Sequence, residues 1–339
     1  MDSRLLGGLR PRDFLRRYWQ KRPFFVRGAL PGFAGMIDVR GLAALARRDD
    51  VESRIVEHRR DTRHGPFKAV SLKKTHSTLL VNGVNLHVPA ADALLQRFNF
   101  VPQARLDDVM VSYATPGGGV GPHVDSYDVF LLQGPGRRQW RVWFEGKILN
   151  HVLHPGDMLY LPPGLKHDGV ALDACFTYSI GFRTPRGAEL GAAFLDWLHE
   201  RGLPDDRYRD PWLLPARNGA RVPAGLIDHS KKTLDRIRWS RRDVERFVGE
   251  YLTAPKPYVV FKPGKGQRPL ARSRVVLDPK TQLLYSNGWF FINGESLRMN
   301  SKPLRSLADQ RSAPGTALRK LAARIAEWHR AGYLHLEKP

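Results

Sequence analysis

The chain has 339 residues, 42% of them apolar and 10% aromatic, which excludes a disordered protein and leaves room for more than one domain. A single cysteine, Cys175, excludes an intramolecular disulfide framework and fits a reducing cytoplasm, and no apolar stretch reaches the length of a membrane span. The net charge of +22 is compatible with a polyanionic partner, yet residues 101–200 hold eight Lys and Arg against eleven Asp and Glu, so all of the excess lies in the flanks. We expect a soluble, cytoplasmic protein with no membrane segment.

The first half of the chain changes from a helical to a β pattern. Apolar spacing predicts helices over residues 11–20, 38–48 and 90–98, and a strand over 23–27. From about 107 to 183 the pattern becomes short β-rich runs divided by turns: DDVMVSYA, YDVFLLQ, RQWRVWF, DMLYLP and FTYSIGF. Many short strands at close spacing indicate a barrel or sandwich, with the helices packed outside its sheets.

The remainder of the chain returns to helical periodicity, over residues 187–202 and 229–252. Further on, strands are expected at VVLD and within LLYSNGWFFINGES, where Asn287-Gly288 and Asn293-Gly294 predict tight turns, and a helix is expected over 316–330. The predicted fold class is therefore mainly β with helices, α+β, with a helical segment and a small winged-helix-like unit at the C-terminal end.

A candidate metal site begins at the segment PGGGVGPHVDSYDV, which places His123 and Asp125 two residues apart after a glycine-rich turn. In a strand, residues i and i+2 project from the same face, so the imidazole and the carboxylate can reach one point inside a barrel. Alone, such a pair is more often solvated or satisfied in a core than bound to a metal.

The segment GDMLYLPPGLKH supplies a third ligand, His167, after a strand and a Pro-Gly turn. Two histidines and one carboxylate form the facial triad that leaves open positions on Fe(II). His151 and His154 compete for the third position, but neither follows the Pro-Gly turn, so we favour His167. Four other histidines lack ligand spacing and are interpreted as surface or core residues: His58, His64, His76 and His87.

A 2-oxoglutarate cosubstrate also requires a cation for its distal carboxylate, because an unpaired buried charge is costly. Arg138 is the candidate, although it belongs to a run with Arg137 and Arg141 of which strand alternation sends only some inward. Hydroxyl groups that could assist lie on two strands, and the sequence does not choose among them: Ser112, Tyr113, Tyr178 and Ser179.

Four segments resemble the JmjC-type cupin ribosomal oxygenases, and among them the bacterial arginine hydroxylases of a large-subunit ribosomal protein: WQKRPFFVRG, PGGGVGPHVDSYDVFLLQGPGRRQWRV, PGDMLYLPPGLKHDG and YSIGFR. The resemblance is close over roughly residues 10–200 and loose afterwards. It implies a double-stranded β-helix barrel with iron ligands at His123, Asp125 and His167, the distal-carboxylate arginine at Arg138, and a site-lining serine at Ser112.

The same resemblance implies a catalytic domain over residues 1–200, a helical dimerisation segment over 201–254 and a winged-helix-like domain over 255–339. It implies oxidative decarboxylation of 2-oxoglutarate with O2 and hydroxylation of a ribosomal protein by a homodimeric enzyme. The mildly acidic central segment suits a cationic substrate side chain such as arginine, with Asp128 and Asp168 as candidate contacts.

Two other functions fit parts of the sequence. An RNA- or ribosome-binding assembly factor would use the basic flanks for ribosomal RNA contact and leave the barrel incidental. A cupin metalloenzyme without 2-oxoglutarate would need no buried arginine, and such sites commonly use more histidines. The intact triad together with Arg138 favours the hydroxylase, while only the resemblance favours arginine over histidine as the hydroxylated residue.

Overall fold

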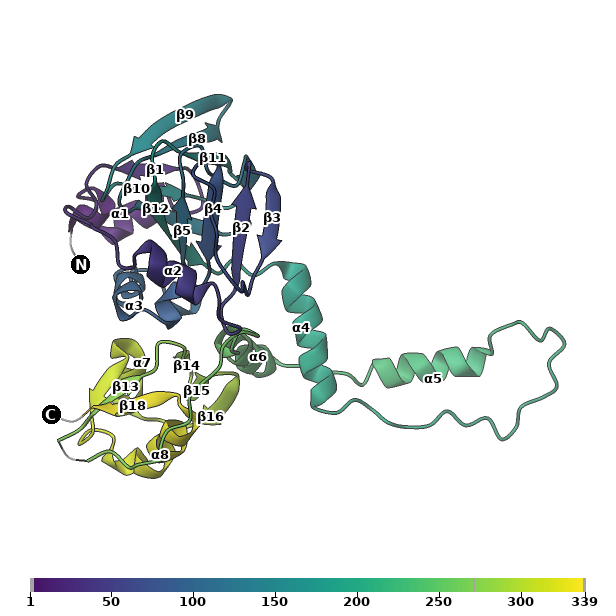
Figure 1. Cartoon of the computed structure of the whole chain (residues 1–339). Coiled ribbons are helices and arrows are strands. Elements are labelled where there is room, and N and C mark those ends of the chain that lie inside the picture. The colour runs from purple at the N-terminus through teal and green to yellow at the C-terminus, as the bar shows by residue number, and fades with distance from the viewer. Residues whose placement is uncertain (1–2, 271, 338–339) are drawn as a thin grey trace. The chain divides into compact units, whose positions relative to one another are not determined.

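The computed structural model describes residues 3–270 and 272–337 and has the predicted α+β class (Figure 1). The chain divides into two compact units. The first takes in the described residues up to Thr184, Pro255–Thr281 and the described residues from Ser301 onward; the second comprises Pro185–Ala254 and Gln282–Asn300. Among the described helices, none is both long and apolar enough to cross a membrane. The domain boundaries expected from the sequence remain a prediction.

Two antiparallel sheets dominate the first unit, and from β5 to β12 the chain passes back and forth between them, with only β8 and β9 consecutive in the same sheet. The larger sheet has the order β1 (Phe24–Val26), β10 (Met158–Leu161), β7 (Asp128–Gln133), β12 (Cys175–Phe182), β5 (Leu106–Ala114), β4 (Ser77–Val81), β2 (Ser53–Glu57), β3 (Asp61–His64). The smaller has the order β6 (His123–Val124), β11 (Lys166–Ala171), β8 (Arg138–Phe144), β9 (Lys147–Leu153). Each of the five runs expected to be strands forms one, whereas β2, β3, β4 and β9 were not predicted.

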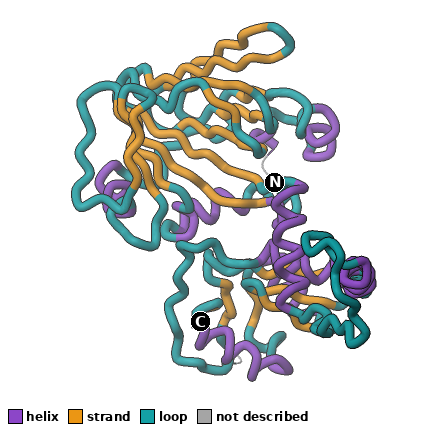
Figure 2. The backbone as a smooth tube through the Cα atoms, turned by 90° about the vertical axis from the view of Figure 1, so that its right-hand side faces the viewer, coloured by secondary structure: helices purple, strands orange, loops and turns teal. Residues whose placement is uncertain are grey.

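The core of this unit lies on the outer face of the larger sheet, where an aromatic cluster includes Phe14, Phe98, Phe130 and Tyr160. The three predicted helices, α1 (Pro11–Arg17), α2 (Val39–Leu45) and α3 (Pro89–Gln96), contribute to it. These helices are labelled in Figure 1, and Figure 2 shows short helices lying beside strands. Short 3-10 turns complete the region: η1 (Ser3–Leu6), η2 (Val84–Leu86) and η3 (Gln103–Arg105). Burial on this face leaves the opposite face of β5, β7 and β12 to line the space between the sheets.

A buried carboxylate on β11 ties this strand of the smaller sheet to its neighbour β8 and to the turn that follows β2. Asp168 has no exposed surface, and it accepts hydrogen bonds from Arg59, in the turn between β2 and β3, and from Arg141 on β8, the latter at 2.6 Å. Burial alone would raise the pKa of Asp168, but the two guanidinium groups outweigh that effect and hold it below its usual value. Asp168 therefore joins three separate parts of the barrel immediately next to His167.

The second unit contains α4 (Gly187–Glu200), α5 (Ala224–Leu234), α6 (Arg241–Thr253) and the sheet β14 (Leu283–Ser286), β15 (Trp289–Ile292), β16 (Glu295–Arg298). The two predicted Asn-Gly turns connect these strands, with positive φ at all four residues. The single helix expected over 229–252 is wrong, because the chain forms two helices there. Ser240 caps α6 by accepting a hydrogen bond from the Asp243 amide, which starts a new helix after the break.

The C-terminal part of the first unit forms a second small sheet, β17 (Ser312–Pro314), β13 (Arg274–Leu277), β18 (Leu334–Glu337). It is accompanied by α7 (Lys302–Gln310), the 3-10 turn η4 (Arg319–Leu321) and α8 (Ala322–Ala331). Turn η4 and α8 together cover the helix expected over 316–330. The C-terminal region thus consists of helices and small sheets.

Replacing Asp168 by Asn should lower the free energy of unfolding by about 2–3 kcal/mol, because two guanidinium groups would lose the charge that they surround in a buried site. Urea denaturation measures this change. The matched control is Asp173→Asn, which breaks an exposed pair with Arg137 and should cost under about 1 kcal/mol. Equal losses in the two variants would contradict the role assigned to Asp168.

Candidate metal centre

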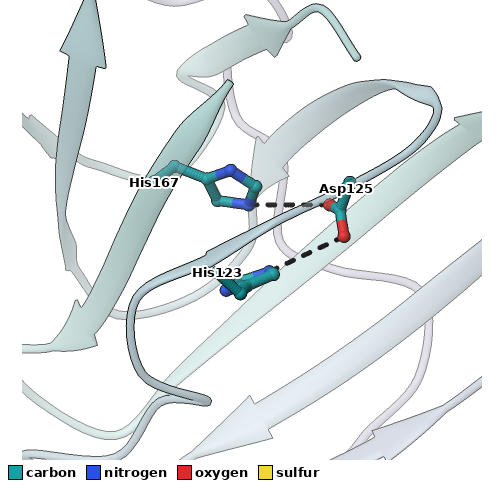
Figure 3. A group of neighbouring side chains, drawn as sticks. All are labelled: His123, Asp125 and His167. Carbon is teal, nitrogen blue, oxygen red and sulfur yellow. Dashed lines mark ion pairs between the residues drawn. The ribbon is translucent and has the colours of Figure 1, made fainter. Parts of the chain in front are cut away.

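Three side chains with metal-ligating atoms meet between the two sheets (Figure 3). The antiparallel pairing of β6 with β11 sets His123 directly opposite His167, and their ring centroids lie 4.2 Å apart. Asp125 follows β6, and its two carboxylate oxygens lie 3.8 Å from His123 Nε2 and 3.5 Å from His167 Nε2. The candidate ligand atoms all lie within 4.8 Å of one another, which is compact enough for a single ion.

Backbone carbonyls orient both imidazoles. The Nδ1 of His123 lies 2.9 Å from the Gly121 carbonyl, and the Nδ1 of His167 lies 2.9 Å from the Leu165 carbonyl. Because a carbonyl only accepts, each Nδ1 carries the proton, which leaves each Nε2 lone pair directed at the Asp125 carboxylate. Burial lowers the pKa of His167, which favours the neutral imidazole that a metal requires.

The other histidines lie elsewhere. His151 stacks on Phe25 with the ring centroids 4.7 Å apart, and His154 interacts with Arg27 and Asp157. Within residues 3–270 and 272–337, the triad is the only group of three or more His, Cys, Asp or Glu side chains with metal-binding spacing. The two histidines that competed for the third ligand position are therefore not brought to the candidate site.

A cavity of about 210 Å³ adjoins the triad. At its wall lies Arg138, a residue that is 5% exposed and whose Nε and Nη2 have no hydrogen-bond partner among residues 3–270 and 272–337. Its guanidinium lies 5.7 Å from the Trp140 ring centroid. An unpartnered buried cation is costly, so this environment suits an anionic ligand that supplies the missing acceptors.

The alternation of side chains along β8 determines which of the three neighbouring arginines points inward. Arg138, Trp140 and Val142 of β8 are buried, whereas Arg137 pairs with Asp173 at the surface and Arg141 reaches Asp168. Only Arg138 of the three arginines lines the cavity.

The same alternation divides the four candidate hydroxyl residues. Ser112 and Ser179 line the cavity, whereas Tyr113 lies outside it and Tyr178 packs in the opposite core, where its hydroxyl accepts a hydrogen bond from the Met36 amide.

Sequence reasoning missed several polar residues that line the cavity, among them two threonines. Thr78 and Thr177 line the cavity and are almost completely buried, and neither side-chain hydroxyl has a hydrogen-bond partner in the described part of the chain. Thr177 could have been found from the period of two on β12, since it precedes Ser179 by two residues. Thr78 could not, because it enters the site only through the pairing of β4 with β5.

The two acidic residues considered as substrate contacts do not line this cavity. Asp168 is held by Arg59 and Arg141, as described above. Asp128 is fully buried and accepts hydrogen bonds from Tyr160 at 2.6 Å, Gln20 at 2.9 Å and Arg105 at 3.3 Å. Both carboxylates serve the packing of the barrel, which leaves neither free for a substrate.

Comparisons with a family model and with individual relatives identify the same family. The JmjC domain family matches residues 93–147 and 144–190. The ribosomal protein uL16 3-hydroxylase of Escherichia coli is 38% identical over 265 residues, covering 71% of this chain and 70% of the relative. The probable ribosomal oxygenase of Haemophilus influenzae is 36% identical over 216 residues, covering 56% of this chain and 54% of the relative.

Solved structures extend the likeness to nearly the whole chain. The Escherichia coli ribosomal oxygenase YcfD in complex with cobalt and 2-oxoglutarate superimposes with a TM-score of 0.82 at 31% identity, covering 97% of this chain and 98% of the other. The same enzyme with cobalt and succinic acid gives equal values. The predicted JmjC/cupin fold is thereby confirmed, and the chain belongs to the JmjC-type ribosomal oxygenases, a family that uses Fe(II) and 2-oxoglutarate.

Proposed function

We propose that this chain hydroxylates an arginine side chain of a large-subunit ribosomal protein, with His123, Asp125 and His167 as ligands of Fe(II) and Arg138 as the partner of the 2-oxoglutarate distal carboxylate. The observation that carries the proposal is the meeting of the triad with a buried, unpartnered guanidinium at one cavity. The relative named as a uL16 3-hydroxylase makes uL16 the first substrate to test.

The residues present fit both groups. Two neutral imidazoles and one carboxylate match the preference of ferrous iron and leave coordination positions for other ligands. At the other end, Arg138 offers two nitrogens without partners, and the hydroxyls of Thr78 and Thr177 are likewise unpartnered. A dicarboxylate that reaches from the metal to Arg138 would satisfy this set of donors.

Fe(II) with bound 2-oxoglutarate and O2 supplies the oxidation, in which 2-oxoglutarate loses CO2 to give succinate, one oxygen atom enters succinate and the other enters a substrate C–H bond as hydroxyl. The protein's own residues orient the metal ligands and the cosubstrate and shield the site from water. The carbonyls of Gly121 and Leu165 hold the imidazoles in the ligating tautomer. Arg138 fixes the cosubstrate, and the apolar walls formed by Val129 and Leu131 exclude water.

The choice of arginine draws on one feature of the cavity. Tyr127 is 38% exposed and lines the cavity together with Asp125 and Met110. A partly exposed aromatic ring suits a planar guanidinium, which stacks on rings. Histidine as the hydroxylated residue is the alternative, and fragmentation of the oxidised peptide distinguishes the two.

Incubation of the iron-loaded protein with 2-oxoglutarate and unmodified uL16 should add one oxygen atom to an arginine, as measured by tandem mass spectrometry. His123→Ala should lower the rate by at least about 100-fold, since loss of a ligand exceeds the effect of losing a group that only supports one. His64→Ala, an exposed histidine on β3, is the matched control and should retain activity. Oxygen on a histidine would refute the arginine assignment, and no oxidised peptide would refute this substrate.

Arg138→Gln should raise the KM for 2-oxoglutarate by about 10- to 100-fold, because a charge-assisted hydrogen bond contributes about 1.5–3 kcal/mol. Iron affinity should stay unchanged, since Arg138 is not a candidate ligand. Arg137→Gln alters the adjacent, exposed arginine and should leave the KM as it is. Steady-state succinate formation at varied 2-oxoglutarate provides both values, and equal effects in the two variants would exclude the assigned role.

We also propose that two copies of the chain pair through the second unit. In support, this unit exposes a series of large apolar side chains that monomeric proteins seldom present together: Leu195, Trp212, Leu213, Leu214, Ile227, Leu234 and Trp239. Ile227 and Leu234 lie seven residues apart on α5, so they share a face.

Ile227→Asp combined with Leu234→Asp should convert a dimer into a monomer, as followed by sedimentation, because an uncompensated charge would be buried on that face. Lys232→Asp, on the same helix but not on the apolar face, should leave the dimer intact. A monomeric wild-type protein would disprove the proposal.

A further inference from the structure

Positive charge is concentrated in one part of the first unit. Residues 255–281 and 301–339 hold fifteen Lys and Arg against four Asp and Glu. These 66 residues thus account for +11 of the chain's net +22 in about a fifth of its length. A uniform bias in composition would give them only a fifth of the charge, so the excess is localised.

Two segments distant in sequence bring these cations together. The Gly264 amide donates hydrogen bonds to the carbonyls of His329 at 3.1 Å and Arg330 at 3.3 Å, and the Gln267 amide donates to His329 Nδ1 at 3.0 Å. The Arg330 guanidinium lies against Gly266, where a Cβ would come within 2.9 Å of Nη2. The segment 262–268 is therefore fixed along the C-terminal end of α8.

The result is a set of exposed cations that we name the α8 basic surface: Lys262, Lys265, Arg268, Arg319, Lys320 and Arg330. Arg319 and Lys320 precede α8 in η4 and Arg330 lies near its end, so the surface follows a helix about 15 Å long. Over that length each strand of a nucleic acid duplex carries several phosphates.

These cations are not neutralised within the described part of the chain. None of the six forms an ion pair with a described Asp or Glu. Glu327, the acidic residue on α8, is paired with Arg324 at 2.7 Å, and Asp278 nearby is paired with His335 at 2.7 Å. The positive potential of the surface therefore extends to solvent, where it attracts a polyanion.

We infer that the α8 basic surface binds the phosphate backbone of RNA. The choice of RNA rests on the proposed function, since a ribosomal protein substrate is surrounded by RNA in its assembled state. An anionic membrane fits less well, because α8 buries its apolar side chains Ile325 and Trp328 and lacks a face that could enter lipid. Contacts of this kind are insensitive to base sequence and raise the enzyme's local concentration near its substrate.

Fluorescence anisotropy with a labelled ribosomal RNA fragment, titrated with the full-length protein at several salt concentrations, tests this inference. Wild type should bind, with affinity falling steeply between about 50 and 200 mM salt. The variant Lys265→Gln/Arg268→Gln/Arg319→Gln/Lys320→Gln should bind at least about 10-fold more weakly, and the slope of log affinity against log salt should become shallower by about 3. Arg319→Gln alone should reduce the slope by about 1, which keeps the test valid if the quadruple variant does not fold.

The matched control changes four exposed arginines and lysines elsewhere in the first unit: Arg12→Gln/Arg40→Gln/Arg47→Gln/Lys68→Gln. Its net charge equals that of the test variant, yet its RNA affinity should remain within about 2-fold of wild type. An equal loss in the control, no RNA binding by wild type, or binding only to phosphatidylserine vesicles would each overturn the inference. Hydroxylation of isolated uL16 should persist in both variants, so failure of the RNA site and failure of the hydroxylase activity are distinguishable.

Discussion

The pairing of β6 with β11 is the constraint on which the candidate site depends. It places His123 opposite His167 across two strands, and Asp125 completes the group from the residue that follows β6. Strand β6 is only two residues long, so this register needs support from outside the ladder. Support comes from Asp168, which anchors β11 to β8 and to the turn after β2, and from the Gly164 amide, which donates to the Asp125 carbonyl at 2.8 Å.

On the opposite wall of the cavity, an environment suited to an anionic ligand lowers the stability of the fold. A guanidinium and two threonine hydroxyls are buried there without hydrogen-bond partners among the residues that the structure describes, which opposes folding. The large core on the other face of β5, β7 and β12 offsets this cost, because most side chains that these strands direct to that face are apolar and buried. Stability and binding are thus assigned to opposite faces of the same strands.

Sequence alone was sufficient for the parts of the site encoded locally. The two-residue spacing of His123 and Asp125 and the Pro-Gly turn before His167 can both be recognised within short segments of sequence. Together they predicted a single metal centre without knowledge of any long-range contact. To predict that Arg138 points into the cavity, the strand register has to be known. To predict that Thr78 lines it, the pairing of β4 with β5, some thirty residues apart in sequence, has to be known. The break between α5 and α6 was missed because apolar periodicity continues across it, whereas the new start of α6 is marked only by Ser240 and Asp243, which cap the helix by reciprocal hydrogen bonds.

The first unit is assembled from three separate stretches of chain, and its small sheet pairs β13 with β18, which ends at Glu337. During synthesis, the barrel strands up to β12 emerge long before this partner. The sheet can therefore close only after residue 337 has left the ribosome that makes it. Until then the edge of β13 that pairs with β18 is open, and the exposed charges of Arg272 and Arg274 beside it disfavour pairing with other chains.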